Sequence, residues 1–244
     1  MTIPPARFRG VLLDWSGTIA AAPDYPELVA AALRERGRAS DGPAVDRVMG
    51  ALRGTAADRV DGPEVDLDLA AHRTSYLGWY HRAGLDPALA EALYRRIADP
   101  AVHRLVPDTG DLLAALHDAG VRVGVLSDIH TDLRPMFAAR AQPAPDGRAW
   151  DTLVHAWSLS YRTRRVKPDP AAFTGAVAAL GLTPVEVLMV GDRAGWDGAG
   201  VGCGITTLLL PSLRDPDERR LQRVLDLVLP GAVLPDHPLV DVPA

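Results

Sequence analysis

The sequence predicts an α/β fold in which a doubly wound parallel sheet carries a helical insertion after its first strand. Two observations lead to this prediction. Short, continuous apolar runs alternate with segments of helical periodicity along most of the chain, as is typical of strands buried on both faces of a parallel sheet. Residues 21–104, by contrast, have helical patterns but no convincing strand. We therefore expect a core of residues 1–20 and 105–244, with residues 21–104 as a separate helical domain.

Five apolar runs are predicted to be the core strands. The first run stops at Asp14, the second at Ser127, and the fourth at Gly191-Asp192. The third run is weaker than the others, and a proline ends the fifth. Such runs, bounded by polar or turn residues, favour buried strands. The expected strands cover residues 11–13, 121–126, 153–157, 187–190 and 206–210.

Helices are expected between these strands and inside the insertion. Leucines at positions 112, 113 and 116 share one face of segment 107–119, and Gly120 provides its C-terminal stop. Asp169-Pro170 predicts the N-cap and first turn of a helix that Gly181 ends. Further helices are expected before Gly37 and over residues 72–82, 86–97 and 217–229.

Composition excludes several classes of protein. The 244 residues include 26 basic and 31 acidic side chains, with a formal net charge of −5, which argues against a surface that coats nucleic acid. The single cysteine, Cys203, cannot form an internal disulfide bond. We find no signal-peptide pattern and no 18-residue apolar window, so we expect a cytoplasmic protein without membrane contact. The oligomeric state stays open, with a homodimer as one alternative.

Lysine occurs once in the chain. Of the 26 basic residues, 25 are arginine, and the exception is Lys167. A lysine side chain is a compact point charge and can form a Schiff base, whereas arginine does neither. Lys167 is therefore a candidate functional residue.

Polar side chains are expected to meet at the carboxyl edge of the sheet, where open parallel sheets bind their ligands. Carboxylates from separate loops suit Mg²⁺, and a carboxylate near a metal and a lysine stays ionised and can act as a nucleophile. A hydroxyl and an ammonium group can hold phosphoryl oxygens. The expected partner is thus a small anionic substrate. The candidates all lie after a predicted strand: Asp14, Ser127, Asp128, Lys167, Asp192 and Asp197.

These residues resemble the ordered motifs of the haloacid dehalogenase superfamily: Asp-Trp-Ser-Gly-Thr at 14–18, Ser127, Lys167-Pro168, and Gly191-Asp192 with Asp197. Four signals in order, over almost the whole chain, are far more specific than one short motif. The resemblance implies a Rossmann-like core with a helical C1-type cap after the first strand. It also implies that Asp14 is the nucleophile of a covalent aspartyl intermediate, with Mg²⁺ as cofactor.

The resemblance further implies a role for each motif residue. Mg²⁺ would be held by Asp14, the main-chain carbonyl of Ser16, and Asp192, with Asp197 acting through water or as a second ligand. Ser127 and Lys167 would be catalytic beside Asp14, because both bind the phosphate and Lys167 also steadies Asp14. Ser16, Gly17 and Asp128 complete the expected substrate-binding set.

Ser16 is the departure from the family pattern. Phosphatases of this superfamily usually carry a second aspartate there, as general acid for the leaving group and base for the attacking water. Serine cannot do this at neutral pH, and such assistance is worth about 10²–10⁴ in rate. Our first hypothesis is an Mg²⁺-dependent hydrolase whose leaving group, such as that of an acyl phosphate, needs no proton. Asp128, His130 or His72 is the alternative proton source.

Three other hypotheses stay open at this point. The string at 14–18 is similar to phosphonoacetaldehyde hydrolase, which cleaves a carbon–phosphorus bond through a Schiff base on a cap lysine. Segment 21–104 contains no lysine, which argues against that mechanism. Haloacid dehalogenases lack the second aspartate and need no metal, but their fourth motif is not the Gly-Asp form present here. The last alternative is a binding or regulatory protein that kept the fold and lost turnover.

Overall fold

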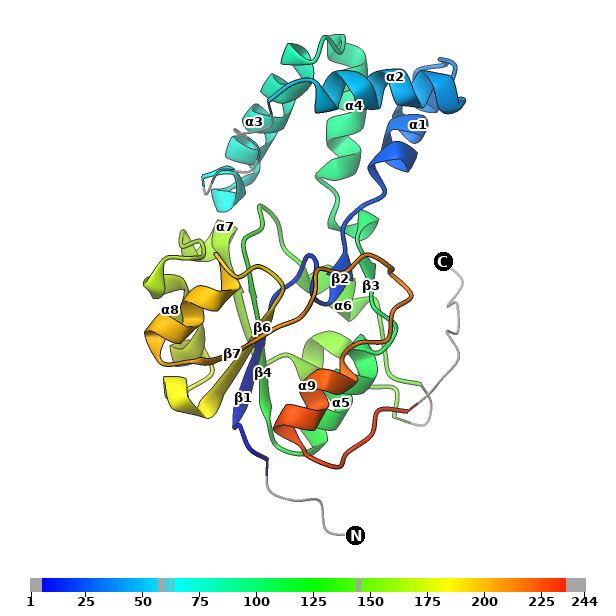
Figure 1. Cartoon of the computed structure of the whole chain (residues 1–244). Helices are drawn as coiled ribbons and strands as arrows, with labels where there is room; N and C mark the ends of the chain where they lie inside the picture. Colours follow the sequence, from blue (N-terminus) through cyan, green and yellow to red (C-terminus); the bar gives the residue numbers. More distant parts are fainter. Residues whose placement is uncertain (1–5, 57–59, 61, 63, 144–145, 236–244) are drawn as a thin grey trace.

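A five-stranded parallel sheet forms the centre of the molecule (Figure 1). The computed structural model describes residues 6–56, 60, 62, 64–143 and 146–235. The strand order is β5-β4-β1-β6-β7, so the chain builds one edge of the sheet before it returns to build the other. This order confirms the predicted doubly wound α/β core. The strands are β1 (Gly10–Leu13), β4 (Arg122–Ser127), β5 (Ala156–Leu159), β6 (Val187–Gly191) and β7 (Thr206–Leu209).

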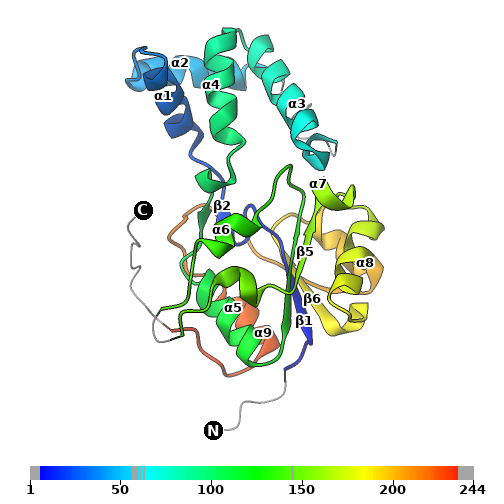
Figure 2. The same cartoon turned by 180° about the vertical axis from the view of Figure 1, so that it is seen from behind.

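Helices cover both faces of the sheet, and the central strand shows why. Val11 and Leu13 of β1 pack into the cluster formed with α5, α6 and α9, whereas Leu12 packs into the cluster formed with α8. A strand that is apolar at every position therefore buries both of its faces. Figures 1 and 2 show the two layers of helices from opposite sides. The core helices are α5 (Thr109–Asp118), α6 (Arg134–Ala138), α7 (Ser160–Thr163), α8 (Pro170–Ala179) and α9 (Gln222–Val228).

The register of the sheet brings three strand ends to one edge. Leu13, the last residue of β1, pairs with Val125 of β4 and with Val190 of β6. The residues that follow these strands therefore emerge side by side. This edge faces the helices drawn at the top of Figure 1.

Those helices form an insertion between two short strands, β2 (Ala20–Ala21) and β3 (Arg104–Leu105), which pair antiparallel. The insertion has its own apolar cluster, separate from the two clusters of the core. Aspartate side chains accept hydrogen bonds from backbone N–H groups at the N-terminus of each long helix, which satisfies donors that the helix leaves unpaired. The elements are α1 (Tyr25–Glu35), α2 (Gly42–Arg53), η1 (Val65–Leu67), α3 (Leu69–Arg82), α4 (Pro87–Ile97) and η2 (Pro100–Val102).

Two expectations about individual elements were wrong, and one helix was not expected. The third strand begins at Ala156 rather than at residue 153, because Leu153 ends a 3₁₀ helix, η3 (Trp150–Leu153), and fills the core from there. The final helix begins at Gln222 rather than at 217, because the backbone N–H of Leu221 donates to the Asp108 carboxylate (2.8 Å) instead of to the carbonyl four residues earlier. Helix α2 had no counterpart among the expected elements. Two further 3₁₀ helices belong to the core: η4 (Pro184–Glu186) and η5 (Asp197–Cys203).

Within the ranges that the structure describes, no helix combines the length and the apolar character that crossing a membrane requires.

Candidate active site

Asp14 lies at the first turn after β1, at the edge where the strand ends meet. Its backbone N–H donates to the carbonyl of Val190 in β6 (2.9 Å), which continues the sheet by one residue. Its carboxylate accepts hydrogen bonds from Thr18 Oγ1 at Oδ2 (3.3 Å) and from the Lys167 side chain at Oδ1. Only 6 % of Asp14 is exposed. The strand end therefore holds a buried carboxylate in a fixed orientation.

A tight loop after Asp14 turns the chain back towards the insertion. The carbonyl of Trp15 accepts from the N–H groups of Ile19 and Ala20 (3.1 and 3.0 Å). Gly17 has φ = +83°, a conformation that glycine adopts without a side-chain penalty. A Cβ atom at Gly17 would lie 2.5 Å from Oδ2 of Asp192, so the loop and Asp192 approach each other only because residue 17 has no side chain.

Lys167 connects the strand ends. Its ammonium donates to Oδ1 of Asp14 and to Oδ1 of Asp197, both at 2.6 Å. Its backbone N–H donates to both carboxylate oxygens of Asp128 (3.0 and 3.2 Å). Burial disfavours the ammonium, but the carboxylates of Asp14, Asp197 and Asp128 outweigh that effect and raise the pKa of Lys167. The side chain is thus a permanent buried cation.

The pKa of Asp14 is raised to about 6. Burial is the largest cause, the Lys167 cation opposes it, and the neighbouring Asp197 carboxylate adds to it. Near neutral pH the carboxylate is ionised but poorly solvated, as a nucleophile must be. The environment therefore suits attack by a carboxylate oxygen.

Two further aspartates follow β6. Asp197 is fully buried, and its Oδ2 accepts from the backbone N–H groups of Asp192 (3.1 Å) and Arg193 (2.9 Å). A Cβ at Gly191 would lie 2.2 Å from Cγ of Asp197, so this turn requires glycine. Asp192 Oδ2 accepts from Ser212 Oγ (2.6 Å). Asp197 thus fixes the loop that presents Asp192.

The residues present fit a hard divalent cation. Carboxylate oxygens of Asp14, Asp192 and Asp197 lie within 4.8 Å of one another, and oxygen ligands are those that Mg²⁺ prefers. Oδ1 of Asp192 is buried with no hydrogen-bond partner, which is a costly arrangement unless a ligand completes it. Asp192 therefore offers one oxygen free for a cation.

A cavity of about 450 Å³ opens between the sheet edge and the insertion. The core contributes Asp14, Ser16, Ser127, Asp128 and Lys167 to its lining, which are five of the predicted site residues. Ser127, the last residue of β4, is almost fully buried, whereas Ser16 is exposed to the cavity. Gly17, Asp192 and Asp197 do not line the cavity. Asp197 accepts from Lys167, which does, and Gly17 lies against Asp192, whose carboxylate is within 4.8 Å of that of Asp14. The structure thus brings all the predicted site residues together.

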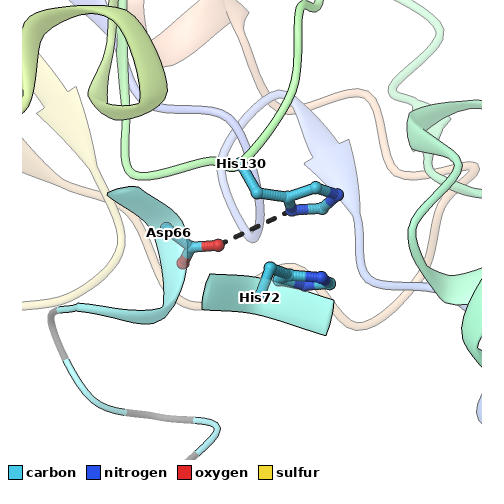
Figure 3. A group of neighbouring side chains, drawn as sticks. All are labelled: Asp66, His72 and His130. Carbon is cyan, nitrogen blue, oxygen red and sulfur yellow. Dashed lines mark ion pairs between the residues drawn. The ribbon is translucent and has the colours of Figure 1, made fainter. Parts of the chain in front are cut away.

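The side of the cavity formed by the insertion is aromatic and carries histidine. Tyr25, His72 and Tyr76 line it, and the His72 ring stacks on His130 of the core with ring centroids 3.6 Å apart. Asp66 lies beside His130 (Figure 3), with Oδ1 3.7 Å from Nδ1. Asp66 was absent from the sequence-based prediction, because nothing in its local pattern links η1 to a loop of the core.

Two hydrogen-bonded contacts hold η1 of the insertion against the core. The Ser160 hydroxyl accepts from the N–H of Ile129 (2.8 Å) and donates to the carbonyl of Asp66 (2.6 Å). Arg164 donates to the carbonyl of Leu67 (2.7 Å) and to the Asp68 carboxylate (2.9 Å). The position of Asp66 in the cavity therefore depends on helix α7 of the core.

A sequence comparison finds that the model of one family, the haloacid dehalogenase-like hydrolases, matches residues 8–201. The comparison with curated proteins gave no match.

Solved structures share the fold. A HAD phosphatase from Thermococcus onnurineus superimposes with a TM-score of 0.53 at 22 % identity, over 86 % of this chain and 89 % of that one. A 2-haloacid dehalogenase from Pseudomonas syringae gives a TM-score of 0.57 at 17 % identity, over 90 % of this chain and 97 % of that one. A HAD-family enzyme from Bacteroides thetaiotaomicron, in complex with magnesium and inorganic phosphate, gives a TM-score of 0.58 at 17 % identity, over 85 % of this chain and 96 % of that one. At these identities the likeness establishes the architecture alone.

Proposed function

The chain belongs to the haloacid dehalogenase-like hydrolases, and from this premise we propose that it hydrolyses a small phosphorylated metabolite with Asp14 as the nucleophile. The observation that carries the proposal is the set of Asp14, Lys167, Asp192 and Asp197, which combines a buried carboxylate, a fixed cation and an incomplete group of oxygen ligands.

Mg²⁺ is the cofactor that we propose for this cage. Asp14, the main-chain carbonyl of Ser16, and Asp192 would hold the ion, while Asp197, whose oxygens already accept three hydrogen bonds, would act through water. When bound, the ion supplies positive charge that offsets the negative charges of the phosphoryl group and the attacking carboxylate. The unpartnered Oδ1 of Asp192 supports this assignment.

The remaining roles follow from the positions of the polar groups. The Lys167 ammonium orients Oδ1 of Asp14 and offers charge to a phosphoryl oxygen, and the Ser127 hydroxyl adds a donor at the end of β4. Asp128 holds the backbone of Lys167 in place. The helical insertion would act as the cap that covers the substrate, with Arg193 as a further cation at the cavity wall.

Metal-independent dehalogenation is the second candidate, because the fold is shared with dehalogenases and position 16 is not acidic. In that reaction Asp14 would attack carbon, and Asp192 would have no metal to bind. The buried, unpartnered Asp192 oxygen favours the phosphoryl reaction over this one.

Turnover measurements separate the candidates. Purified protein with Mg²⁺ would be assayed against phosphate monoesters and acyl phosphates, with Asp14→Asn as the control. We expect phosphate release that requires Mg²⁺ and Asp14, and binding of beryllofluoride that requires Mg²⁺. Halide release from 2-haloacids that resists EDTA would establish the second candidate instead. Absence of turnover together with absence of beryllofluoride binding would leave a binding protein.

A further inference from the structure

Asp66 and His130 form a carboxylate–imidazole pair across the boundary between the insertion and the core (Figure 3). His130 lies in the loop after β4, three residues beyond Ser127, and Asp66 belongs to η1. Both residues line the cavity that also contains Asp14 and Ser16. An imidazole thus shares the cavity with the nucleophile, in a chain whose residue 16 cannot carry a proton for the reaction.

The contacts of His130 determine which of its nitrogens exchanges a proton. Nε2 lies 3.1 Å from the carbonyl oxygen of Ala98, which can only accept, so Nε2 carries hydrogen. Nδ1 is therefore the atom that gains or loses a proton. The carboxylate of Asp66, 3.7 Å away, stabilises positive charge there without a close hydrogen bond that would retain the proton.

The ring of His130 is also held from one face. His72 stacks on it with an interplanar angle of 19°, and His72 Nδ1 is itself 3.2 Å from the Tyr94 hydroxyl. His130 is 8 % exposed, so its packing leaves little freedom of rotation. A side chain held in this way is preorganised for proton transfer.

Other titratable groups at the cavity are less suited to carry the proton. Burial, and then the neighbouring His130, lowers the pKa of His72 to about 3, and burial likewise lowers that of His103 to about 4. Both rings are neutral near pH 7. Asp128 accepts the Lys167 backbone N–H with both oxygens, and the Lys167 ammonium already donates to two carboxylates.

We propose that His130, supported by Asp66, is the general acid and base of the reaction, in the role that Ser16 does not fill. The inference rests on the proposed phosphoryl hydrolysis. In the first step an Asp14 oxygen bonds to phosphorus, the bond from phosphorus to the leaving oxygen breaks, and Nδ1 of His130 gives its proton to that oxygen. In the second step water attacks phosphorus and gives a proton to Nδ1. The bond from phosphorus to Asp14 then breaks, which releases phosphate and restores both side chains.

Asp66, His72 and His130 also offer three donor atoms within 4.8 Å of one another. A metal ion lies about 2.0–2.1 Å from a ligating imidazole nitrogen and in the plane of its ring. Two rings stacked 3.6 Å apart at 19° cannot both meet that condition. The observed arrangement therefore favours proton transfer over metal binding.

A series of aryl phosphates tests the inference, because protonation matters more as the leaving group becomes more basic. The probes are 4-nitrophenyl, phenyl and 4-methoxyphenyl phosphate with Mg²⁺. In His130→Gln we expect kcat/KM to fall by about 10² or more for 4-methoxyphenyl phosphate and to change little for 4-nitrophenyl phosphate. Asp66→Asn should give a smaller loss with the same dependence on leaving group.

His117→Gln, in α5, is the matched control and should follow the wild type, and thermal unfolding would verify that each variant folds. An equal loss for all three phosphates, or no loss, would overturn the role of His130 while leaving the proposed function intact. A stoichiometric bound Zn²⁺ that disappears in His130→Gln would overturn it as well. If the wild-type protein hydrolyses none of the series but releases halide from 2-haloacids, the proposed function itself fails.

Discussion

The side-chain nitrogen of Lys167 donates a 2.6 Å hydrogen bond to Oδ1 of Asp14. The same nitrogen donates to Asp197 at the same distance, so one buried cation neutralises part of the charge of two buried carboxylates. Removing either partner of such a pair leaves a buried charge without compensation. The arrangement links the proposed nucleophile, the second aspartate after β6 and the only lysine of the chain in one network.

Lys167→Arg should fold and lose most of its activity. A planar guanidinium is larger than an ammonium and cannot place one nitrogen 2.6 Å from both carboxylates in a site that is 4 % exposed. Loss of a preorganised donor in an active site reduces kcat by about 10²–10³. Steady-state kinetics and circular dichroism would test this, with the exposed Arg165→Lys as control. Full activity of Lys167→Arg would show that any buried cation serves at this position.

Gly17→Ala should disturb the metal site, and Gly37→Ala should not. Both glycines have positive φ values (+83° and +65°), so both alanine variants carry a strain of roughly 1–2 kcal/mol. Only at Gly17 would the new Cβ collide with Asp192, since nothing lies within 4 Å at Gly37. We expect Mg²⁺ to raise the melting temperature of wild type and Gly37→Ala, but much less that of Gly17→Ala. An equal Mg²⁺ shift in all three proteins would contradict the assignment of Asp192.

Ser16→Asp should restore the hydrolysis of basic leaving groups to a His130→Gln protein. Ser16 is exposed to the cavity, so a longer side chain has room there. An aspartate at this position would supply the proton that the altered residue 130 no longer supplies, and such assistance is worth about 10²–10⁴ in rate. The measurement is kcat/KM for 4-methoxyphenyl phosphate in the single and double variants. If kcat/KM for 4-methoxyphenyl phosphate is no higher in the double variant than in His130→Gln, a side chain at residue 16 does not reach the leaving group.

The contribution of His72 to the stability of the protein should fall as the pH is lowered from 7 to 5. Burial, and then the neighbouring His130, lowers the pKa of His72 to about 3 in the folded protein. Below pH 6.5 the His72 side chain is therefore protonated in the unfolded chain but stays neutral in the folded one. The stabilising contribution of the neutral ring is therefore complete above pH 6.5 and is lost progressively towards pH 3. For His72 alone this amounts to about 2 kcal/mol between pH 7 and pH 5.

Urea unfolding at pH 7 and pH 5 would measure this effect. In His72→Gln the loss of unfolding free energy between the two pH values should be smaller than in the wild type by about that amount. The lowered pKa of His103 acts in the same direction as that of His72, and the raised pKa of Asp14 acts in the opposite direction. Both groups are present in both proteins, so the difference isolates His72. Equal losses would show that His72 is solvated in the folded state.

Much of the core site follows from local sequence. A buried strand that ends at a polar residue places that residue at the sheet edge, and this rule was enough to bring Asp14, Ser127 and Asp192 together. The start of β5 was misplaced because the rule recognises only apolar character, which strand residues share with other buried residues. Leu153 is as apolar as a strand residue but is buried from a 3₁₀ helix.

The pairing across the two parts of the chain could not be predicted in this way. Sequence separates Asp66 from His130 by 64 residues, and no periodicity relates η1 to the loop after β4. His72 and His130 could be named as alternative proton sources, but their stacking on each other depends on how the insertion docks. That docking follows from single contacts such as the one between Ser160 and Asp66 rather than from a repeated pattern.

The hydrogen bond from Ser160 to the main chain of Asp66 also bears on how such an enzyme can evolve. In a two-part protein, recombination can replace the inserted part and leave the residues of the core, here Asp14 and Lys167, unchanged. Here the exchange would remove Asp66 and His72 together with the old specificity, and His130 would remain without its carboxylate. We therefore expect the insertion and the core to evolve together, with new substrate specificity arising from point substitutions inside the existing insertion.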